Sequence, residues 1–415
     1  MAQQTLKDLF TKYASESIII FKDRDFLTDR YIPDDIPHRE EQVDQLAKIL
    51  APSIKGQRVS NTFIFGTVGT GKSCVAKHVT KELSKISDNV KVIYINCKLK
   101  KVSDTEYRMI AEILRIMGKK IPYTGLPTDE VFKIFYETLD SKKSVVVLIL
   151  DEIDALVSKI GDDILYRFTR INEELKETKL SLIGISNDTT FTDNLDPRVK
   201  SSLSEEEIIF PPYNAAQLQD ILNQRAKLAF DDSVLAEGVI AKCAALAAQE
   251  HGDARKALNL LRISGEIAER EKNSKINIEH LDKAENKLDT DKTVEIVKTQ
   301  PRQSQAVLAA ILKLLEKDPK NIQTGDVFSL YEKICVSKGL KVLTQRRVSD
   351  LIGELDMLSI INTKIISRGR YGRSKEIKVL LEKNILKKIR EILKENYLLT
   401  DNLFLDAQKN KLGMV

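Results

Sequence analysis

Apolar residues follow two different patterns along the chain. Up to about residue 210, short runs that are apolar on both sides alternate with segments whose apolar residues recur every three or four positions. The runs at 62–65, 90–96, 145–150 and 180–186 are typical of buried parallel strands, and the segments between them are typical of amphipathic helices. This alternation predicts an α/β domain with a doubly wound parallel sheet.

Two helices are expected between the second and third strands, where a minimal crossover needs one. The first begins near Asp104 and ends at Gly118, and the second follows the capping sequence Thr128-Asp129-Glu130. We therefore interpret the helix over 104–118 as an insertion.

Strands are no longer predicted after Pro211-Pro212-Tyr213. Helices are expected over 215–229, 233–249, 253–271 and 278–298, and Thr299-Gln300-Pro301 interrupts this pattern. Three more helices, over 303–316, 324–338 and 344–357, precede two short strands at 360–366 and 376–381, which is the outline of a winged helix. The expected domains are 1–211 (α/β), 212–298 (helical), 299–383 (winged helix) and 384–415 (C-terminal helix and tail).

Composition and charge exclude some classes of protein. A chain of 415 residues with 42% hydrophobic and 31% charged residues is typical of several globular domains. Its longest apolar run, 145–150, is far too short to span a membrane, and the N-terminus has no secretion signal, so we expect a cytoplasmic protein without a membrane partner. The four scattered cysteines predict neither disulfides nor structural zinc, and a net charge of +5 says little about nucleic acid.

A phosphate-binding loop follows the first predicted strand. The stretch Gly66-Thr67-Val68-Gly69-Thr70-Gly71-Lys72-Ser73 fits G-x-x-x-x-G-K-[ST], and Cys74 continues into the next helix. Such a loop directs its backbone N–H groups at phosphates, Lys72 reaches the β- and γ-phosphates, and Ser73 joins the Mg²⁺ shell. A chance glycine turn would not need this strand and helix on either side, so we predict binding of ATP/ADP with Mg²⁺.

Polar residues end the next two apolar strands. Asp151 is expected to hold Mg²⁺ through water, and Glu152 to orient and deprotonate the attacking water. Asn187 can fix the same water or contact the γ-phosphate, although Asn-Asp is also a turn sequence. In the helical region Asp253 caps a helix that carries Arg255, which can report the γ-phosphate or simply be a surface arginine.

His38 and Arg39 lie at the start of a predicted helix. Considered without the nearby nucleotide site, they are most simply interpreted as solvated helix-start residues.

Basic residues mark the predicted winged helix. The turn between its two strands contains Arg368, Arg370, Arg373 and Lys375, and no acidic residue occurs before Glu376. Arg346 and Arg347 lie at the start of the preceding helix, where recognition helices usually meet base edges. These residues are predicted to bind DNA, although a solvated turn and an exposed helix would show the same pattern.

The motif order resembles a known family. GTVGTGKS, LILDEID, IGISN, LDPRVKSSL, FPPY and GDARKAL, followed by a winged helix, are similar to the AAA+ ATPases of the archaeal origin-recognition type. The resemblance extends from about residue 15 to 383. It implies an AAA+ core with a helical lid over 212–298, double-stranded origin DNA, the replicative helicase and paralogous initiator subunits as partners, and association with the nucleoid.

The resemblance also implies roles for individual residues. Asp151 and Glu152 correspond to Walker B, Asn187 to sensor 1 and Arg255 to sensor 2, and the helix over 104–118 to the insertion that lies against DNA. Arg198 corresponds to an arginine acting in trans on a neighbouring subunit, with a salt bridge inside the domain as the alternative. Tyr213 and Arg225 correspond to lid positions that hold the nucleotide, with hinge packing as the alternative.

These expectations favour a replication initiator with slow, regulatory ATP hydrolysis. A second hypothesis is a signalling or transcriptional switch that joins a P-loop domain to a winged helix, but such proteins often lack a basic wing and a lid arginine. A third is a DNA-binding regulator with an inactive site, which the complete set Lys72, Asp151, Glu152 and Asn187 disfavours.

Overall fold

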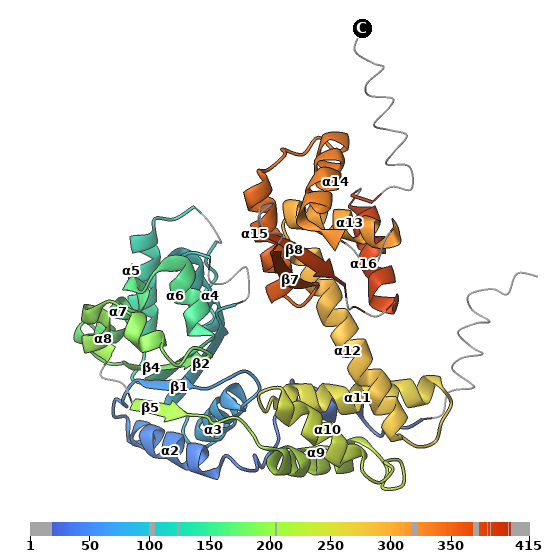
Figure 1. The fold of residues 1–415 in the computed structure, drawn as a ribbon. Coiled ribbons are helices and arrows are strands. Elements are labelled where there is room, and N and C mark those ends of the chain that lie inside the picture. The colour runs from blue at the N-terminus through green and yellow to red at the C-terminus, as the bar shows by residue number, and fades with distance from the viewer. Residues whose placement is uncertain are drawn as a thin grey trace, which may run out of the picture. The chain divides into compact units, whose positions relative to one another are not determined.

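The computed structural model forms two compact units, Met1–Ala284 and Glu285–Val415, and the boundary between them falls within one helix. Figure 1 shows the fold with its elements labelled. The structure describes residues 19–98, 104–122, 125–203, 206–317, 322–367, 373–379, 381, 383–396, 398 and 399.

A five-stranded parallel sheet is the centre of the first unit. Its strands are β1 (Thr62–Phe65), β2 (Val90–Asn96), β3 (Val145–Asp151), β4 (Lys179–Ser186) and β5 (Glu206–Ile209), in the spatial order β2-β3-β4-β1-β5. All four pairings are parallel, and every residue of β3 is buried. The doubly wound parallel sheet expected from the apolar runs is confirmed.

Alternate residues of the strands enter two different cores. Phe63 and Leu148 pack on one face of the sheet, whereas their neighbours Ile64 and Ile149 pack on the other. The second face is covered by α2 (Glu40–Leu50) and α3 (Lys72–Ile86). Both layers exclude water from the strands, which explains why these strands are apolar throughout.

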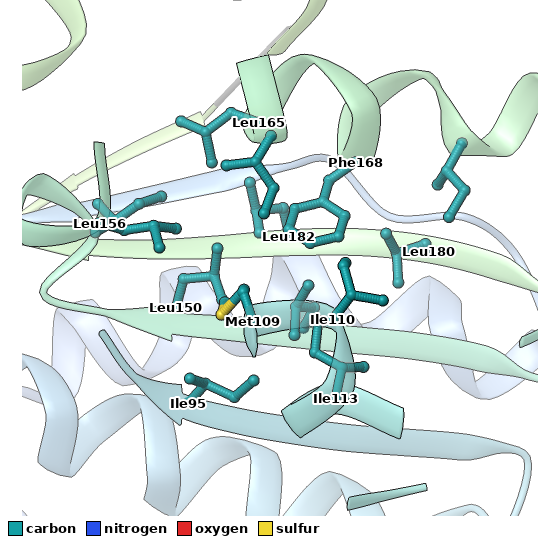
Figure 2. Close-up of a cluster of buried hydrophobic side chains, with 14 of the residues drawn as sticks. Ile95, Met109, Ile110, Ile113, Leu150, Leu156, Leu165, Phe168, Leu180 and Leu182 are labelled. Atoms are coloured by element: carbon teal, nitrogen blue, oxygen red, sulfur yellow. The ribbon is translucent and has the colours of Figure 1, made fainter. Parts of the chain in front are cut away.

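The larger core lies on the opposite face of the sheet (Figure 2). The helices of this region are α4 (Glu106–Ile116), α5 (Thr128–Leu139), α6 (Ile153–Ile160), α7 (Asp163–Arg170) and α8 (Pro197–Leu203). Met109, Ile110 and Ile113 of α4 lie beside Leu150 and Leu182 of the sheet. Most of the apolar side of α4 is therefore part of the domain core, whereas Arg115 and the last residue, Ile116, are exposed.

A helical region follows the sheet. It contains α9 (Ala215–Ala229), α10 (Val239–Gln249), α11 (Ala254–Arg270) and the first part of α12 (Ile278–Thr299). Asn214 and Gln217 form a capping box that fixes the start of α9. The expected helix over 233–249 begins instead at Val239, because Leu235 pairs with Ile276 and Gly238 takes a left-handed conformation before the helix.

The second unit is a winged helix. Its helices are α13 (Arg302–Lys317), α14 (Thr324–Ser337), α15 (Gln345–Met357) and α16 (Lys383–Glu395), and its antiparallel strands are β6 (Ile322–Gln323), β7 (Asn362–Ser367) and β8 (Arg373–Lys378). The strand order is β6-β8-β7, so the expected hairpin gains a short third strand that the sequence pattern did not predict. Apolar residues of all four helices form one core.

Four short 3-10 helices complete the described secondary structure of the first unit: η1 (Arg24–Leu27), η2 (Ala51–Lys55), η3 (Ile171–Glu173) and η4 (Phe191–Asn194). None of the helices in the described ranges combines the length and the apolar composition needed to cross a bilayer.

The close packing of β4 against β1 predicts the effect of one added methyl group. A Cβ atom at Gly184 would lie 2.5 Å from the Phe63 ring, so Gly184→Ala should overpack the core and destabilise the first unit by about 1–3 kcal/mol. Gly325→Ala in α14 is the matched control, because no atom lies within 4 Å of its added Cβ. Denaturant unfolding measures both changes, and equal stability of Gly184→Ala and the wild type would contradict the described packing.

Candidate functional site

The largest set of predicted site residues lines one cavity of about 310 Å³ in the first unit. The loop from Val68 to Cys74, the strand ends at Asp151, Glu152 and Asn187, and the lid residues Tyr213, Arg225 and Arg255 all contribute to its wall. Further lining comes from residues 28–37 near the N-terminus. A cavity at the carboxyl ends of parallel strands is the usual ligand position in this architecture.

The glycine loop touches the helical region directly. The amide of Ala254 donates a hydrogen bond to the carbonyl oxygen of Gly69, 3.2 Å away. A Cβ atom at Gly69, whose φ is 76°, would lie 1.7 Å from the carboxylate of Asp253. Only glycine therefore allows the loop and the start of α11 to come this close.

Lys72 is buried and its ammonium is fully engaged. Its Nζ donates to the carbonyl oxygens of Gly66 (2.6 Å) and Thr67 (2.7 Å) and to Oδ1 of Asn187 (2.9 Å). An ammonium has three donors, so this set satisfies it completely. Burial lowers the pKa of Lys72 to about 8, partly opposed by the nearby charge of Asp151. An incoming phosphate must therefore exchange with these neutral acceptors.

Asp151 is held at the end of β3 by two hydrogen bonds. One carboxylate oxygen accepts from the Tyr94 hydroxyl, and the other accepts from the amide of Glu152 at 3.0 Å. The Tyr94 hydroxyl also interacts with Ser73, and burial together with the charge of Asp151 raises the pKa of Tyr94. Tyr94 thus lies between the two predicted Mg²⁺ ligands.

Sequence reasoning missed Tyr94, which was treated only as part of an apolar strand. The available signal is its place two residues before the end of β2, whose last residue, Asn96, pairs with Asp151.

Glu152 takes an unusual backbone conformation. Its φ of 56° lies in the left-handed region, which is costly for a residue other than glycine and is typical of functional positions. Its carboxylate lies 3.4 Å from the ammonium of Lys98. Glu152 is one of the residues that line the cavity.

The lid residues occupy different environments. Arg225 is buried, donates to the carbonyl oxygens of Phe26 and Tyr31 (3.4 Å each) and lies over the Tyr31 ring. Tyr213 is also buried, and its ring lies 3.8 Å from the guanidinium carbon of Arg39. Arg255 is exposed at the first turn of α11, where Asp253 caps the helix. Its positive charge helps to lower the pKa of Lys72.

Arg39 does not fit its solvated interpretation. Only 2% of its surface is exposed, and its guanidinium donates to three backbone carbonyl oxygens. Its guanidinium contacts Thr70 of the phosphate loop and the segment 210–213, which are distant in sequence, so no local pattern reports its burial. His38 is partly exposed and lies 3.0 Å from Asp220.

Arg198 lies outside the cavity wall. Its side chain is 81% exposed on α8 and pairs with Asp196 at 3.1 Å. The pair with Asp196 is the salt bridge that one interpretation expects. Because such an exposed ion pair contributes little stability, it would also let Arg198 act on a neighbouring subunit, as the other interpretation expects.

The predicted DNA-binding residues lie in the second unit. Arg346 and Arg347 are exposed at the start of α15, where Thr344 caps the helix, and Arg347 pairs with Glu354 at 3.2 Å. Lys375 on β8 instead donates to the carbonyl oxygen of Ser349 at 3.4 Å, so its side chain lies against α15. Arg373 begins β8, whereas Arg368 and Arg370 lie outside the described residues.

The sheet, the glycine loop at its carboxyl edge and the helical lid define an AAA+ P-loop nucleotide-binding protein with a C-terminal winged helix. Three family models match the chain: "AAA domain" over residues 56–188, "Cdc6 AAA+ ATPase-type lid domain" over 219–286 and "CDC6, C terminal winged helix domain" over 295–389.

Curated relatives extend the similarity over nearly the whole chain. An ORC1-type DNA replication protein of Pyrococcus furiosus is 51% identical over 403 residues, covering 95% of this chain and 94% of the relative. The ORC1-type DNA replication protein 1 of Methanosarcina mazei is 48% identical over 400 residues, covering 95% of each chain. Among solved structures, the Aeropyrum pernix ORC1 protein in complex with DNA matches with a TM-score of 0.76 at 40% identity, covering 91% of this chain and 98% of that one.

The chain belongs to the family of ORC1-type DNA replication proteins, so the resemblance stated from the motifs is confirmed. The signalling switch is not favoured, because replication proteins match this chain over more than nine tenths of their length.

The lowered pKa of Lys72 predicts how nucleotide affinity depends on pH. Phosphate attracts the charged ammonium, so affinity should be highest below the pKa of about 8 and should fall as the pH rises above it, where the free protein loses this proton. Calorimetric titration with ATP at pH 7, 8 and 9 measures the effect. Lys72→Arg should flatten the profile because guanidinium stays charged, and a flat wild-type profile would contradict the assignment.

Proposed function

We propose that this chain is an ATP-dependent DNA replication initiator that binds double-stranded origin DNA and helps to load the replicative helicase. One observation carries the proposal: a cavity lined by the glycine loop, the strand ends and the lid occurs in one chain with a winged helix. The family membership agrees with this combination. Residues 1–211 would form the nucleotide-binding domain, 212–298 the lid, 299–383 the DNA-binding domain and 384–415 the C-terminal helix and tail.

The residues around the cavity fit ATP with Mg²⁺. The hydroxyl of Ser73 and the carboxylate of Asp151 are hard oxygen donors, which suit Mg²⁺ when phosphate and water complete its shell. Lys72 would exchange its carbonyl partners for the β- and γ-phosphates, and Asn187, released from Lys72, would contact the γ-phosphate or the attacking water. Bound Mg²⁺ would neutralise charge that develops on the phosphates.

Hydrolysis would be slow and regulatory. Glu152 is the proposed general base, but its carboxylate is close to the Lys98 ammonium, which competes with the attacking water for the carboxylate oxygens. Arg255, exposed at the cavity wall, would contact the γ-phosphate and distinguish ATP from ADP. Arg198, exposed on α8, would reach the nucleotide of a neighbouring initiator subunit after release from Asp196.

DNA would be bound mainly by the winged helix. Arg346 and Arg347 would meet the major groove from the start of α15, and the turn between β7 and β8 would contact phosphates or the minor groove. The polar side of α4 would supply a second contact, since its apolar side belongs to the core. Such a protein would act at the nucleoid in the cytoplasm. Footprinting on the organism's own origins distinguishes an initiator from a general DNA-binding regulator.

Replacing the proposed base tests the ATPase assignment. Glu152→Gln keeps the shape of the side chain but cannot accept a proton from water, so ATP hydrolysis should fall by about 100-fold or more while ATP binding persists. The control is Glu130→Gln on the exposed start of α5. Phosphate release and equilibrium binding of a fluorescent ATP analogue are measured for both, and wild-type turnover in Glu152→Gln would show that another residue is the base.

Replacing the two arginines of α15 tests the DNA-binding assignment. Changing Arg346 and Arg347 to Ala should weaken duplex binding and make the slope of log K against log salt shallower by about 0.9 for each phosphate that the protein no longer neutralises. If these residues read bases instead, origin DNA should lose more affinity than random duplex.

The matched control for this experiment removes the same charge from another helix of the same unit. Lys387 and Lys388 are exposed on α16, and their replacement by Ala should change the affinity less. Fluorescence anisotropy over a salt series measures both variants, and ATP affinity should stay constant in each. If both pairs of substitutions weakened DNA binding equally, α15 would contribute only its positive charge, and its assignment as the DNA-binding helix would be contradicted.

A further inference from the structure

Arg39 connects three parts of the first unit through one guanidinium. It precedes α2 as the N-cap residue, and its Nε donates to the carbonyl oxygen of Thr70 in the phosphate loop at 2.9 Å. One terminal nitrogen donates to the carbonyl oxygen of His38 at 2.9 Å, and the other to that of Pro211 at 2.5 Å. The plane of this side chain therefore spans from the loop to the segment that leads into the lid.

The bond to Thr70 controls an amide that faces the phosphate position. In a trans peptide the carbonyl group and the following N–H point in opposite directions. Because Arg39 holds the Thr70 carbonyl on its own side, the N–H of Gly71 is turned to the other side of the same peptide plane. Gly71 precedes Lys72, the first residue of α3, so this N–H belongs to the helix start that binds phosphate in such loops.

The other end of the guanidinium fixes the hinge before the lid. Pro211 follows β5 by two residues, and Asn214 caps α9, so the chain between them is the connection from sheet to lid. Arg39 binds the Pro211 carbonyl and lies over the Tyr213 ring, 3.8 Å from its centre, with Phe210 5.6 Å away. The amide of Phe210 in turn donates to the Phe65 carbonyl at 2.8 Å, which ties this connection to β1.

The chemistry of these contacts requires arginine. All three acceptors are neutral carbonyl oxygens, and a cation stacked on an aromatic face gains energy without a counter-charge. Burial lowers the pKa of Arg39, yet a guanidinium remains charged in proteins. A lysine ammonium is a point charge and cannot present several donors in one plane while stacking on a ring.

We propose that Arg39 is a positioning residue that couples the phosphate loop to the lid hinge. Phosphate binding at the Gly71 amide requires the 70–71 peptide plane that Arg39 holds, and the same guanidinium sets the backbone at 211–213. Occupancy of the phosphate site and the angle of the lid are then linked through one rigid group. The inference rests on the proposed nucleotide binding and adds the element that transmits it to the lid.

The experiment compares Arg39→Lys and Arg39→Met with the wild type and with Arg170→Met. Arg170 pairs with Glu173 on the surface and controls for the removal of an arginine. Fluorophores at Asp88 and Asp232, both exposed, report the distance between the sheet domain and the lid by energy transfer. ATP and ADP affinities and the thermal unfolding of the free protein are measured on the same samples.

We expect ATP and ADP to change the energy transfer in the wild type and in Arg170→Met. Arg39→Lys should bind both nucleotides about tenfold more weakly, the equivalent of one charged hydrogen bond. At saturating ATP its energy transfer should remain near that of the free protein. The coupling would be overturned if ATP-saturated Arg39→Lys showed the same change in energy transfer as the wild type. It would also be overturned if the wild type bound ATP without any change in energy transfer. A wild type that binds no nucleotide would instead refute the proposed function.

A second variant keeps the test informative if the Arg39 variants fold poorly. Tyr213→Leu removes the ring on which the guanidinium lies and leaves the three carbonyl acceptors in place. Like Arg39→Lys, it should reduce the change in energy transfer that ATP causes. In the double variant with Arg39→Lys this change should decrease by less than the sum of the two single decreases, because both substitutions remove the same contact. Additive decreases, or a wild-type lid response of saturated Tyr213→Leu, would overturn the proposal.

Discussion

The burial of one lysine cation organises the nucleotide site. Lys72 begins α3 directly after the glycine loop, and a charge removed from water must be hydrogen-bonded on every donor. The loop carbonyls of Gly66 and Thr67 meet two of these donors, and Asn187 at the end of β4 meets the third. The loop and the end of a second strand are therefore positioned together by a single ammonium group.

The order of the strands brings further polar residues to the same edge of the sheet. Since β4 lies between β1 and β3, the ends of three neighbouring parallel strands place the loop, Asn187 and Asp151 along one edge. Tyr94 on β2 extends this edge, because Asn96 pairs with Asp151. The two apolar cores fix the positions of these strands, and hydrogen bonds hold the buried polar groups Lys72 and Asp151 in place beside the strand ends.

The fold could be predicted well because strands buried on both faces leave unbroken apolar runs such as 145–150, and amphipathic helices leave an apolar residue every three or four positions, as in 104–118. The glycine loop and the acidic strand end are also local in sequence. By contrast, Arg39 and Tyr94 act through contacts with residues far away in the chain, and neither local polarity nor spacing reports those contacts. The start of α10 was misplaced for a similar reason, since the pairing of Leu235 with Ile276 overrides an apolar stripe that continues across it.

The contact between the lid and the glycine loop has a kinetic consequence. Ala254 is bonded to Gly69, and Asp253 packs where no side chain of residue 69 would fit, so the start of α11 lies directly on the loop that would hold the phosphates. If a nucleotide binds beneath this contact as proposed, it would leave only after the two segments separate. The opening rate of the lid would then set the residence time of the nucleotide. ADP would stay bound long after hydrolysis, so the protein would remain in its ADP state until the lid opened.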